Sequence, residues 1–182
     1  MCILYNKMIK KIIFLAGYPG CGRTTVGNIL VKDYGYTKHS FSNRLKNIVN
    51  AKYTGSDGSV SQFAWAPKST QATLPSIKDL NREAELWKYN YHNDIWAKLL
   101  IADISPTDDK IVITDLKYRN EYDAVNIHYP NKNVATWFIK RPGVNAASDP
   151  SENCQVNDFV FDAILNNAAD IDALKASVRN SL

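Results

Sequence analysis

Short apolar runs alternate with segments of helical periodicity along the chain. A continuous apolar run bounded by turn residues is typical of a strand buried on both faces, and apolar spacings of three and four are typical of a helix. The runs that predict strands are 10–17, 36–41, 110–116, 135–143 and the weaker 162–167. The segments that predict helices are 23–34, 42–51, 79–104 with a break near 90–93, 120–128 and 170–182.

A few glycine and polar positions mark the ends of the expected helices. Gly35 follows the last periodic residue of the first helix and is expected to end it. Short polar side chains accept the free N–H groups at a helix start. We therefore expect Ser42 or Asn43 to cap the second helix and Asp170 to cap the last.

The segment 52–76 is rich in Gly, Ser, Pro and Thr and predicts a long loop or irregular insertion. A loop of this length inside a compact domain is uncommon unless it serves as a lid or binding segment. The length of 182 residues suits one core. We therefore expect a single domain over 1–182, with 52–104 as a lid-like, substrate-binding insertion.

Strands that alternate with helices predict a five-stranded parallel sheet with helices on both faces. In such an α/β fold the ligand binds beyond the carboxyl ends of the strands. Three candidate features follow strand ends: the glycine-rich segment 17–24 after the first strand, Asp115 after the third and Arg141 after the fourth. Their convergence predicts one site at that edge of the sheet.

The stretch GYPGCGRT (17–24) nearly matches the phosphate-binding pattern G-x-x-x-x-G-K-[ST], and it follows a strand and opens a helix as that mechanism requires. Glycines let the backbone wrap a phosphate, and the helix adds its positive N-terminal end. The alternative is an ordinary tight turn between strand and helix. The predicted nucleotide-binding residues are Gly17, Tyr18, Pro19, Gly20, Cys21, Gly22, Arg23, Thr24, Thr25 and Arg141.

Arg23 stands where the pattern has lysine. Lysine is a compact point charge, whereas arginine is a bulkier planar fork. The positive charge is kept, so nucleotide binding is expected. The altered geometry leaves weakened catalysis, a changed phosphate donor or a purely binding role as alternatives.

Composition narrows the class of protein further. The net charge of +4 suits a protein that handles phosphates but is not the concentrated basic footprint of a dedicated nucleic-acid binder. No apolar stretch is long enough for a membrane span, and no signal peptide is expected. Three scattered cysteines and three isolated histidines predict neither disulfides nor a metal cluster, so we expect a cytoplasmic protein.

Several segments, taken in order, make the chain resemble the P-loop deoxynucleoside monophosphate kinases of bacteriophages and their relatives. The opening IIFLAGYPGCGRTT is followed by HSFSNRLKNIV, similar to the family's F-[SA]-x-x-L-K. NDIWAKLL is similar to its N-x-x-W stretch, VITDLKYRNEYDAV to its strand and D-x-R-x-x-x-E, and WFIKRPG and AILNNAADIDALKASV to its closing elements. The chain departs from the family at Lys117, where arginine is expected; arginine occurs instead at Arg119.

The resemblance implies ATP and Mg²⁺ as cofactors. Thr24 is the expected Mg²⁺ ligand, and Asp115 is expected to hold a metal-bound water or orient the acceptor, with a helix cap as its alternative. Glu121 is expected to brace its helix. The candidate catalytic and phosphate-binding cations are Arg23, Lys117, Arg119 and Arg141, each of which has a solvated surface charge as its alternative.

The acceptor is expected between 41–46 and the long helical segment. By the resemblance, Arg44 and Lys46 would hold the substrate phosphate. Spacings of seven, four and three let Arg82, Tyr89, Asn93 and Trp96 share one helical face, which suits a stacked base, whereas Trp87 is expected in the core.

The leading functional hypothesis is transfer of the ATP γ-phosphate to a (deoxy)nucleoside monophosphate in a closed, water-excluding site. The second keeps the donor but places the acceptor in DNA, as a 5-hydroxymethyl-pyrimidine such as 5-hydroxymethyluracil. The third is a nucleotide-binding module without catalysis. The sequence leaves open the base preference and the choice between monomer and homodimer.

Overall fold

The computed structural model describes residues 11–54, 76–130, 133–147 and 153–182. Within them, five parallel strands form one sheet in the order β2-β3-β1-β4-β5. This confirms the expected five-stranded parallel sheet. The strands are β1 (Lys11–Ala16), β2 (Thr37–His39), β3 (Lys110–Ile113), β4 (Asn133–Lys140) and β5 (Ala163–Asn166).

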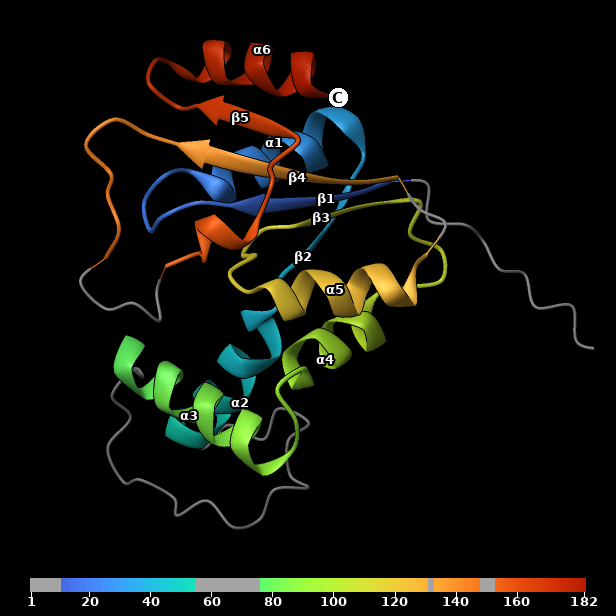
Figure 1. Cartoon of the computed structure of the whole chain (residues 1–182), viewed down its shortest axis with the longest axis vertical. Coiled ribbons are helices and arrows are strands. Elements are labelled where there is room, and N and C mark those ends of the chain that lie inside the picture. The colour runs from blue at the N-terminus through green and yellow to red at the C-terminus, as the bar shows by residue number, and fades with distance from the viewer. Residues whose placement is uncertain (1–10, 55–75, 131–132, 148–152) are drawn as a thin grey trace, which may run out of the picture.

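Helices cover both faces of the sheet (Figure 1). α1 and α6 lie on one face and α4 and α5 on the other, while α2 and α3 pack together in a lobe beyond the latter face. The result is a three-layer α/β fold. The helices are α1 (Arg23–Tyr34), α2 (Ser42–Thr54), α3 (Ile77–Asn90), α4 (Ile95–Asp103), α5 (Arg119–His128) and α6 (Ile171–Ser181), with a short 3-10 helix at Val156–Asp158.

The central strand β1 explains why its sequence is continuously apolar. It pairs with β3 on one side and β4 on the other. Ile12 and Phe14 join the core cluster beneath α2, α4 and α5, whereas Ile13 and Leu15 join the cluster beneath α1 and α6. All four side chains are fully buried, so no position on this strand can be polar without a buried partner.

Most predicted helix ends are confirmed. Gly35 ends α1 with a left-handed φ of 70°, and the Asp170 side chain caps α6 by accepting the N–H of Ala173. The break between α3 and α4 lies near the expected position. One difference is that α2 continues to Thr54, so the first residues of the expected 52–76 loop are helical; 55–75 lie outside the described residues.

The strand order determines where the functional residues meet. Because β3, β1 and β4 are neighbours, the segments that follow their carboxyl ends lie side by side. The glycine-rich loop follows the middle strand of the three. It therefore faces the polar residues after β3 on one side and those after β4 on the other.

Candidate active site

The glycine-rich loop adopts a wrapped conformation that other residues cannot follow. Gly17, Gly20 and Gly22 have φ angles of 146°, 82° and 108°, in the region that favours glycine. A Cβ at Gly17 would lie 2.7 Å from the carbonyl oxygen of Ile139. Arg141, after β4, donates to the carbonyl oxygen of Gly20 at 3.4 Å. The predicted nucleotide-binding residue Arg141 is therefore in contact with the loop.

The side chain of Asn167, which directly follows the edge strand β5, holds the glycine-rich loop in place. Its Nδ2 donates to the Cys21 carbonyl oxygen at 2.8 Å, and its backbone N–H donates to the Lys140 carbonyl oxygen at 2.8 Å. A Cβ at Gly22 would collide with the same side chain. Sequence reasoning missed this residue, although its position in the turn after the last strand was the available signal.

The first turn of α1 is open to an anion. The helix begins at Arg23, directly after the loop, and neither an acidic residue nor a capping side chain occupies its first turn. The first N–H groups of a helix lack intrahelical partners and carry partial positive charge. Thr24 and Thr25 are exposed there. Wrapped backbone and helix start together form a phosphate-binding cradle.

Arg23 carries a buried donor with no partner. Its Nη1 is inaccessible to solvent and makes no hydrogen bond with any described residue. The guanidinium lies near Cys154: burial raises the pKa of that thiol to about 11, while the positive charge of Arg23 opposes the rise. Leaving a charged donor buried and unbonded costs about 1–3 kcal/mol or more. A phosphate oxygen in the cradle would satisfy it, so the residues present fit a bound nucleotide.

Asp115 joins the end of β3 to the start of α2. Its Oδ1 accepts the N–H of Phe41 at 2.9 Å, and its Oδ2 accepts the N–H of Ser42 at 3.0 Å and the hydroxyl of Ser40 at 2.7 Å. The alternative role, a cap of the helix that follows this strand, is not what Asp115 performs: it holds the start of α2 instead. The predicted cap by Ser42 or Asn43 is wrong because α2 already begins at Ser42. A carboxylate has about four acceptor sites, so one remains for a metal-bound water.

Glu121 is buried at the start of α5. Its Oε2 accepts the N–H groups of Lys117 and Tyr118, both at 3.0 Å, which confirms its expected bracing role. Burial raises the pKa of Glu121 to about 7; the two backbone hydrogen bonds oppose this rise, and the charge of Asp115 adds to it. The loop after β3 therefore owes its shape to a carboxyl group that titrates near neutral pH.

Arg119 is held against neighbouring residues in this structure. Its Nε donates to Asp123 at 2.9 Å, and its Nη1 donates to the carbonyl oxygen of Asp158 at 3.3 Å. The guanidinium also lies 5.2 Å from the centre of the Tyr122 ring. These contacts tie α5 to the segment between β4 and β5.

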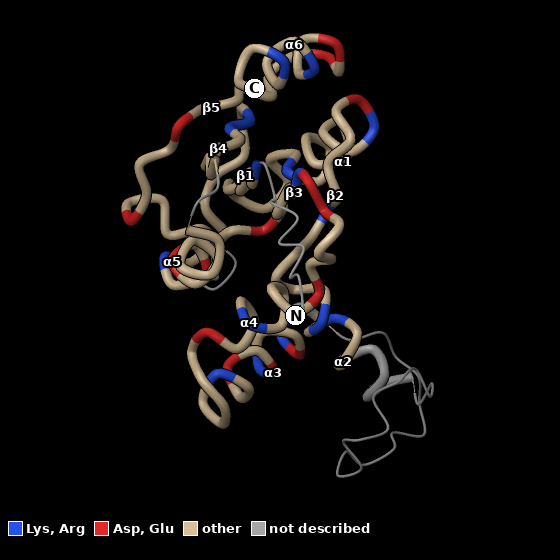
Figure 2. The backbone as a smooth tube through the Cα atoms, turned by 90° about the vertical axis from the view of Figure 1, so that its right-hand side faces the viewer, with Lys and Arg blue, Asp and Glu red and all other residues tan. Residues whose placement is uncertain are grey.

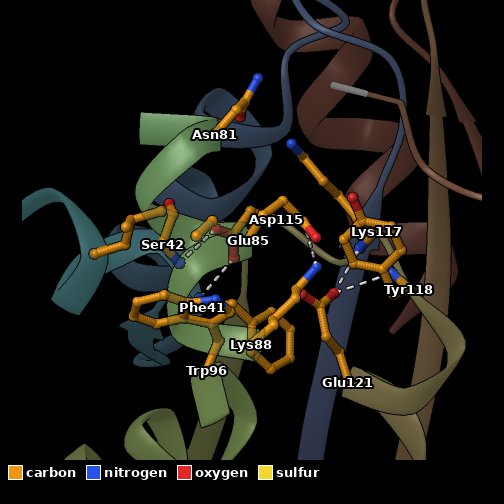
Figure 3. A pocket seen from close by; sticks show the side chains of 12 residues that line it. Phe41, Ser42, Asn81, Glu85, Lys88, Trp96, Asp115, Lys117, Tyr118 and Glu121 are labelled. Carbon is orange, nitrogen blue, oxygen red and sulfur yellow. Dashed lines mark hydrogen bonds and ion pairs between the residues drawn. The ribbon is translucent and has the colours of Figure 1, made fainter. Parts of the chain in front are cut away.

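An open cleft with a volume of about 80 Å³ lies between α2, α3, α4 and the end of β3. Figure 3 shows side chains from α3 on one side facing Lys117, Tyr118 and Glu121 on the other. Both basic and acidic positions lie along α3 (Figure 2). The cleft is lined by Phe41, Ser42, Leu45, Asn81, Ala84, Glu85, Lys88, Trp96, Asp115, Lys117, Tyr118 and Glu121.

Of the predicted acceptor-binding residues, Trp96 lines this cleft and the other five do not. Arg44 instead forms an ion pair with Asp103 of α4, and Lys46 is exposed on α2. Tyr89 is 89% exposed. These side chains therefore do not line the cleft in the described part of the chain.

The predicted shared helical face of Arg82, Tyr89, Asn93 and Trp96 is wrong. α3 ends at Asn90 and α4 begins at Ile95, so the helical phase is lost between them. The Nη2 atom of Arg82 lies 4.0 Å from Oδ1 of Asp79 on the same helix. The α3 face that lines the cleft is Asn81, Ala84, Glu85 and Lys88, which sequence reasoning missed although the spacing is helical.

The predicted Mg²⁺ ligands are one hydroxyl, on Thr24, and one carboxylate, on Asp115. Among the described residues no group of three or more His, Cys, Asp or Glu could hold a metal ion. Mg²⁺ is commonly bound by one or two protein oxygens, with phosphates and waters as the other ligands. Thr24 and Asp115 fit that pattern.

The glycine loop, the helix start after it and the strand order together define the three-layer α/β fold of P-loop nucleoside triphosphatases. None of the helices in the described ranges has the length and apolar character needed to cross a bilayer.

Solved structures confirm this fold. The chain is similar to TT1252 from Thermus thermophilus, with a TM-score of 0.53 and 13% identity over 94% of this chain and 95% of that one. It is also similar to the dephospho-CoA kinase from Campylobacter jejuni, with a TM-score of 0.50 and 12% identity over 93% and 94% of the chains. No protein-family model matches the sequence, and a comparison with curated proteins finds no match.

Proposed function

We propose that the chain is an ATP-dependent kinase that transfers the γ-phosphate to an acceptor in the cleft, with a (deoxy)nucleoside monophosphate as the first candidate. The observation that carries this proposal is the unbonded Nη1 of Arg23 beside the phosphate cradle. A triphosphate supplies the oxygens that this donor lacks. The neighbouring cleft supplies a place for an acceptor.

The nucleotide would bind along the loop from Gly17 to Gly22, with its phosphates at the start of α1. Arg23 would bind the transferred phosphate, and Arg141 would lie beside the loop where it already contacts Gly20. Bound Mg²⁺ would neutralise negative charge on the β- and γ-phosphates. Phosphoryl transfer needs positioning and charge stabilisation more than covalent help from the protein.

The acceptor would approach from the cleft. Asp115 lines it and also holds the start of α2, so the same carboxylate fixes the cleft wall and faces the acceptor. Lys117 lines the same side. The side chains of α3 and α4 would hold the acceptor in line with the γ-phosphate and exclude water.

The charges that line the cleft favour a second candidate, a 5-hydroxymethyl-pyrimidine in DNA. Three carboxylates, on Glu85, Asp115 and Glu121, face two amines, on Lys88 and Lys117. A monophosphate would bring two further negative charges, whereas a hydroxymethyl group brings none. Its oxygen would form the bond to phosphorus, its proton would pass to a carboxylate, and ADP would leave as the bond to the γ-phosphate breaks.

A basic path along Lys52, Lys68 and Lys78 toward the cleft would favour DNA as the acceptor, and Lys78 is the only one of the three whose side chain the structure describes. Lys68 and the Lys52 side chain lie outside the described residues, and Lys78 is exposed on α3. The choice between the two acceptors therefore depends on an assay.

The test is phosphate transfer from γ-labelled ATP with Mg²⁺ to a panel of deoxynucleoside monophosphates and to DNA that contains 5-hydroxymethyluracil. Label in a diphosphate supports the first candidate, and label in the DNA supports the second. Arg23→Met should abolish transfer, whereas Arg179→Met, an exposed arginine on α6, should not. Bound ATP without transfer to either acceptor would overturn both candidates and leave a nucleotide-binding module.

A further inference from the structure

The cleft has aromatic and aliphatic walls. Phe41 and Leu45 of the α2 region, Ala84 of α3 and Trp96 of α4 line it, and both Phe41 and Trp96 are almost fully buried. Small-molecule sites are typically apolar with a small number of polar groups that fix orientation. These walls suit a flat ring.

Trp96 presents a hydrogen-bond donor that no described residue accepts. The side chain is 5% exposed, and its Nε1 is buried without a partner. The indole N–H is only a donor, so the missing group is an acceptor atom. The ring packs against Trp87, with centroids 5.6 Å apart, and a ring held in this way cannot readily turn its N–H elsewhere.

The charged groups around the cleft favour a ring without charge. The Nζ atom of Lys88 lies 3.0 Å from Oε1 of Glu85 and 4.4 Å from the centre of the Tyr118 ring. Its charge also opposes the rise in the pKa of Glu121. The amine of Lys88 thus has carboxylates beside it. An anionic ring would compete with those carboxylates, and an isolated cationic ring would meet Lys88.

We propose that the cleft binds a neutral, planar heterocycle that carries a carbonyl oxygen, and that the Nε1–H of Trp96 donates to that oxygen. A pyrimidine-dione fits this description. An exocyclic amine at the same place would set one donor against another, so Trp96 selects carbonyl-bearing rings. The inference rests on the proposed function because it names the ring of the acceptor.

The test is calorimetric titration, without ATP, of 2′-deoxyuridine monophosphate and its two analogues that lack either the 2-carbonyl or the 4-carbonyl. We expect one analogue to bind roughly tenfold to a hundredfold more weakly than the parent. Trp96→Phe keeps a ring but removes the donor. It should therefore weaken binding of the parent ligand by the same factor and leave binding of the weaker analogue unchanged. Tyr91→Phe, an exposed position outside the cleft lining, should keep the wild-type discrimination.

Proton NMR of the indole N–H groups of the wild-type protein gives a second measurement that needs no folded variant. The sequence holds four tryptophans, and the parent ligand should shift one indole signal downfield while the weaker analogue does not. Equal binding of all three ligands, a Trp96→Phe variant that folds and still discriminates, or no binding at all would overturn the inference.

The two proposals fail separately. Phosphate transfer that does not depend on the ring carbonyl or on Trp96 would overturn the inference and leave the kinase intact. Ring binding with the expected discrimination but no transfer from ATP would support the inference and overturn the proposed function.

Discussion

The carboxylate of Asp115 accepts the backbone N–H of Ser42 at 3.0 Å, across 73 positions of sequence. This bond fixes the first turn of α2 to the end of β3, next to the loop that follows β1. Asp115 therefore helps to hold the lobe formed by α2 and α3 against the phosphate side of the site.

Asp115→Asn should destabilise the fold and abolish phosphate transfer. An amide turned toward Phe41 and Ser42 can satisfy them only with its single oxygen, since its nitrogen is a donor like theirs. We expect a loss of about 1–3 kcal/mol in the free energy of unfolding, measured with urea. Asp172→Asn, an exposed acid on α6, should change it by less than about 0.5 kcal/mol. Equal effects of the two changes would refute the linking role.

Arg23→Met should stabilise the protein without nucleotide and weaken ATP binding. Methionine removes the buried donor that has no partner, which we expect to raise the free energy of unfolding by about 1 kcal/mol. ATP should bind roughly tenfold to a hundredfold more weakly. Thermal unfolding with and without ATP measures both effects, with Arg179→Met as control. A variant that is destabilised and still binds ATP normally would contradict the assignment.

Glu121→Gln should change how stability depends on pH. The folded protein holds the Glu121 proton up to a pKa of about 7, against 4.5 for an ordinary glutamate, so the folded state binds more protons than the unfolded state between these values. Stability therefore falls as pH rises through this window. The full effect is about 3 kcal/mol.

Gln keeps an oxygen for the N–H groups of Lys117 and Tyr118 but does not titrate. Urea unfolding at pH 5 and pH 8 should show wild type losing this stability relative to the variant. Parallel pH curves for the two proteins would show that the carboxyl group titrates normally in the fold.

Asn167→Ala should raise the KM for ATP with little change in the fold. Losing the bond from Nδ2 to the Cys21 carbonyl loosens the glycine-rich loop, and one such bond contributes about 1 kcal/mol, or about fivefold in binding. The adjacent Asn166 is exposed on β5 and provides the matched control, Asn166→Ala. Steady-state kinetics distinguish the two, and indistinguishable KM values would refute the bracing role.

The elements that the sequence predicted correctly are those that depend on a local pattern of residues. The apolar run of β1, the glycine after α1 and the polar cap at Asp170 each act within a few residues of the chain. The fold and the phosphate loop followed from such signals. Glu121 was also predicted correctly, because its bonds run only three and four residues back.

The residues whose positions the sequence failed to predict depend on how separate helices and strands are connected and packed together. The segment between α3 and α4 is not helical, so residues on the two helices do not share one helical face. Tyr89 is therefore exposed, although its spacing to Trp96 in the sequence is helical. Asn167 and Cys21 meet across 146 positions, which no local pattern encodes. The pairing of Arg44 with Asp103 likewise depends on how α2 packs on α4.

The sheet order also fixes when the site can form during synthesis of the chain. β1 emerges first, yet its partners begin at Lys110 and Asn133, and the brace at Asn167 comes later still. At the ribosome's pace of about 5–20 residues per second, β1 waits several seconds for its neighbours. A nascent chain that stops before residue 167 has a glycine-rich loop without its brace, so the phosphate site matures only after this residue has been added.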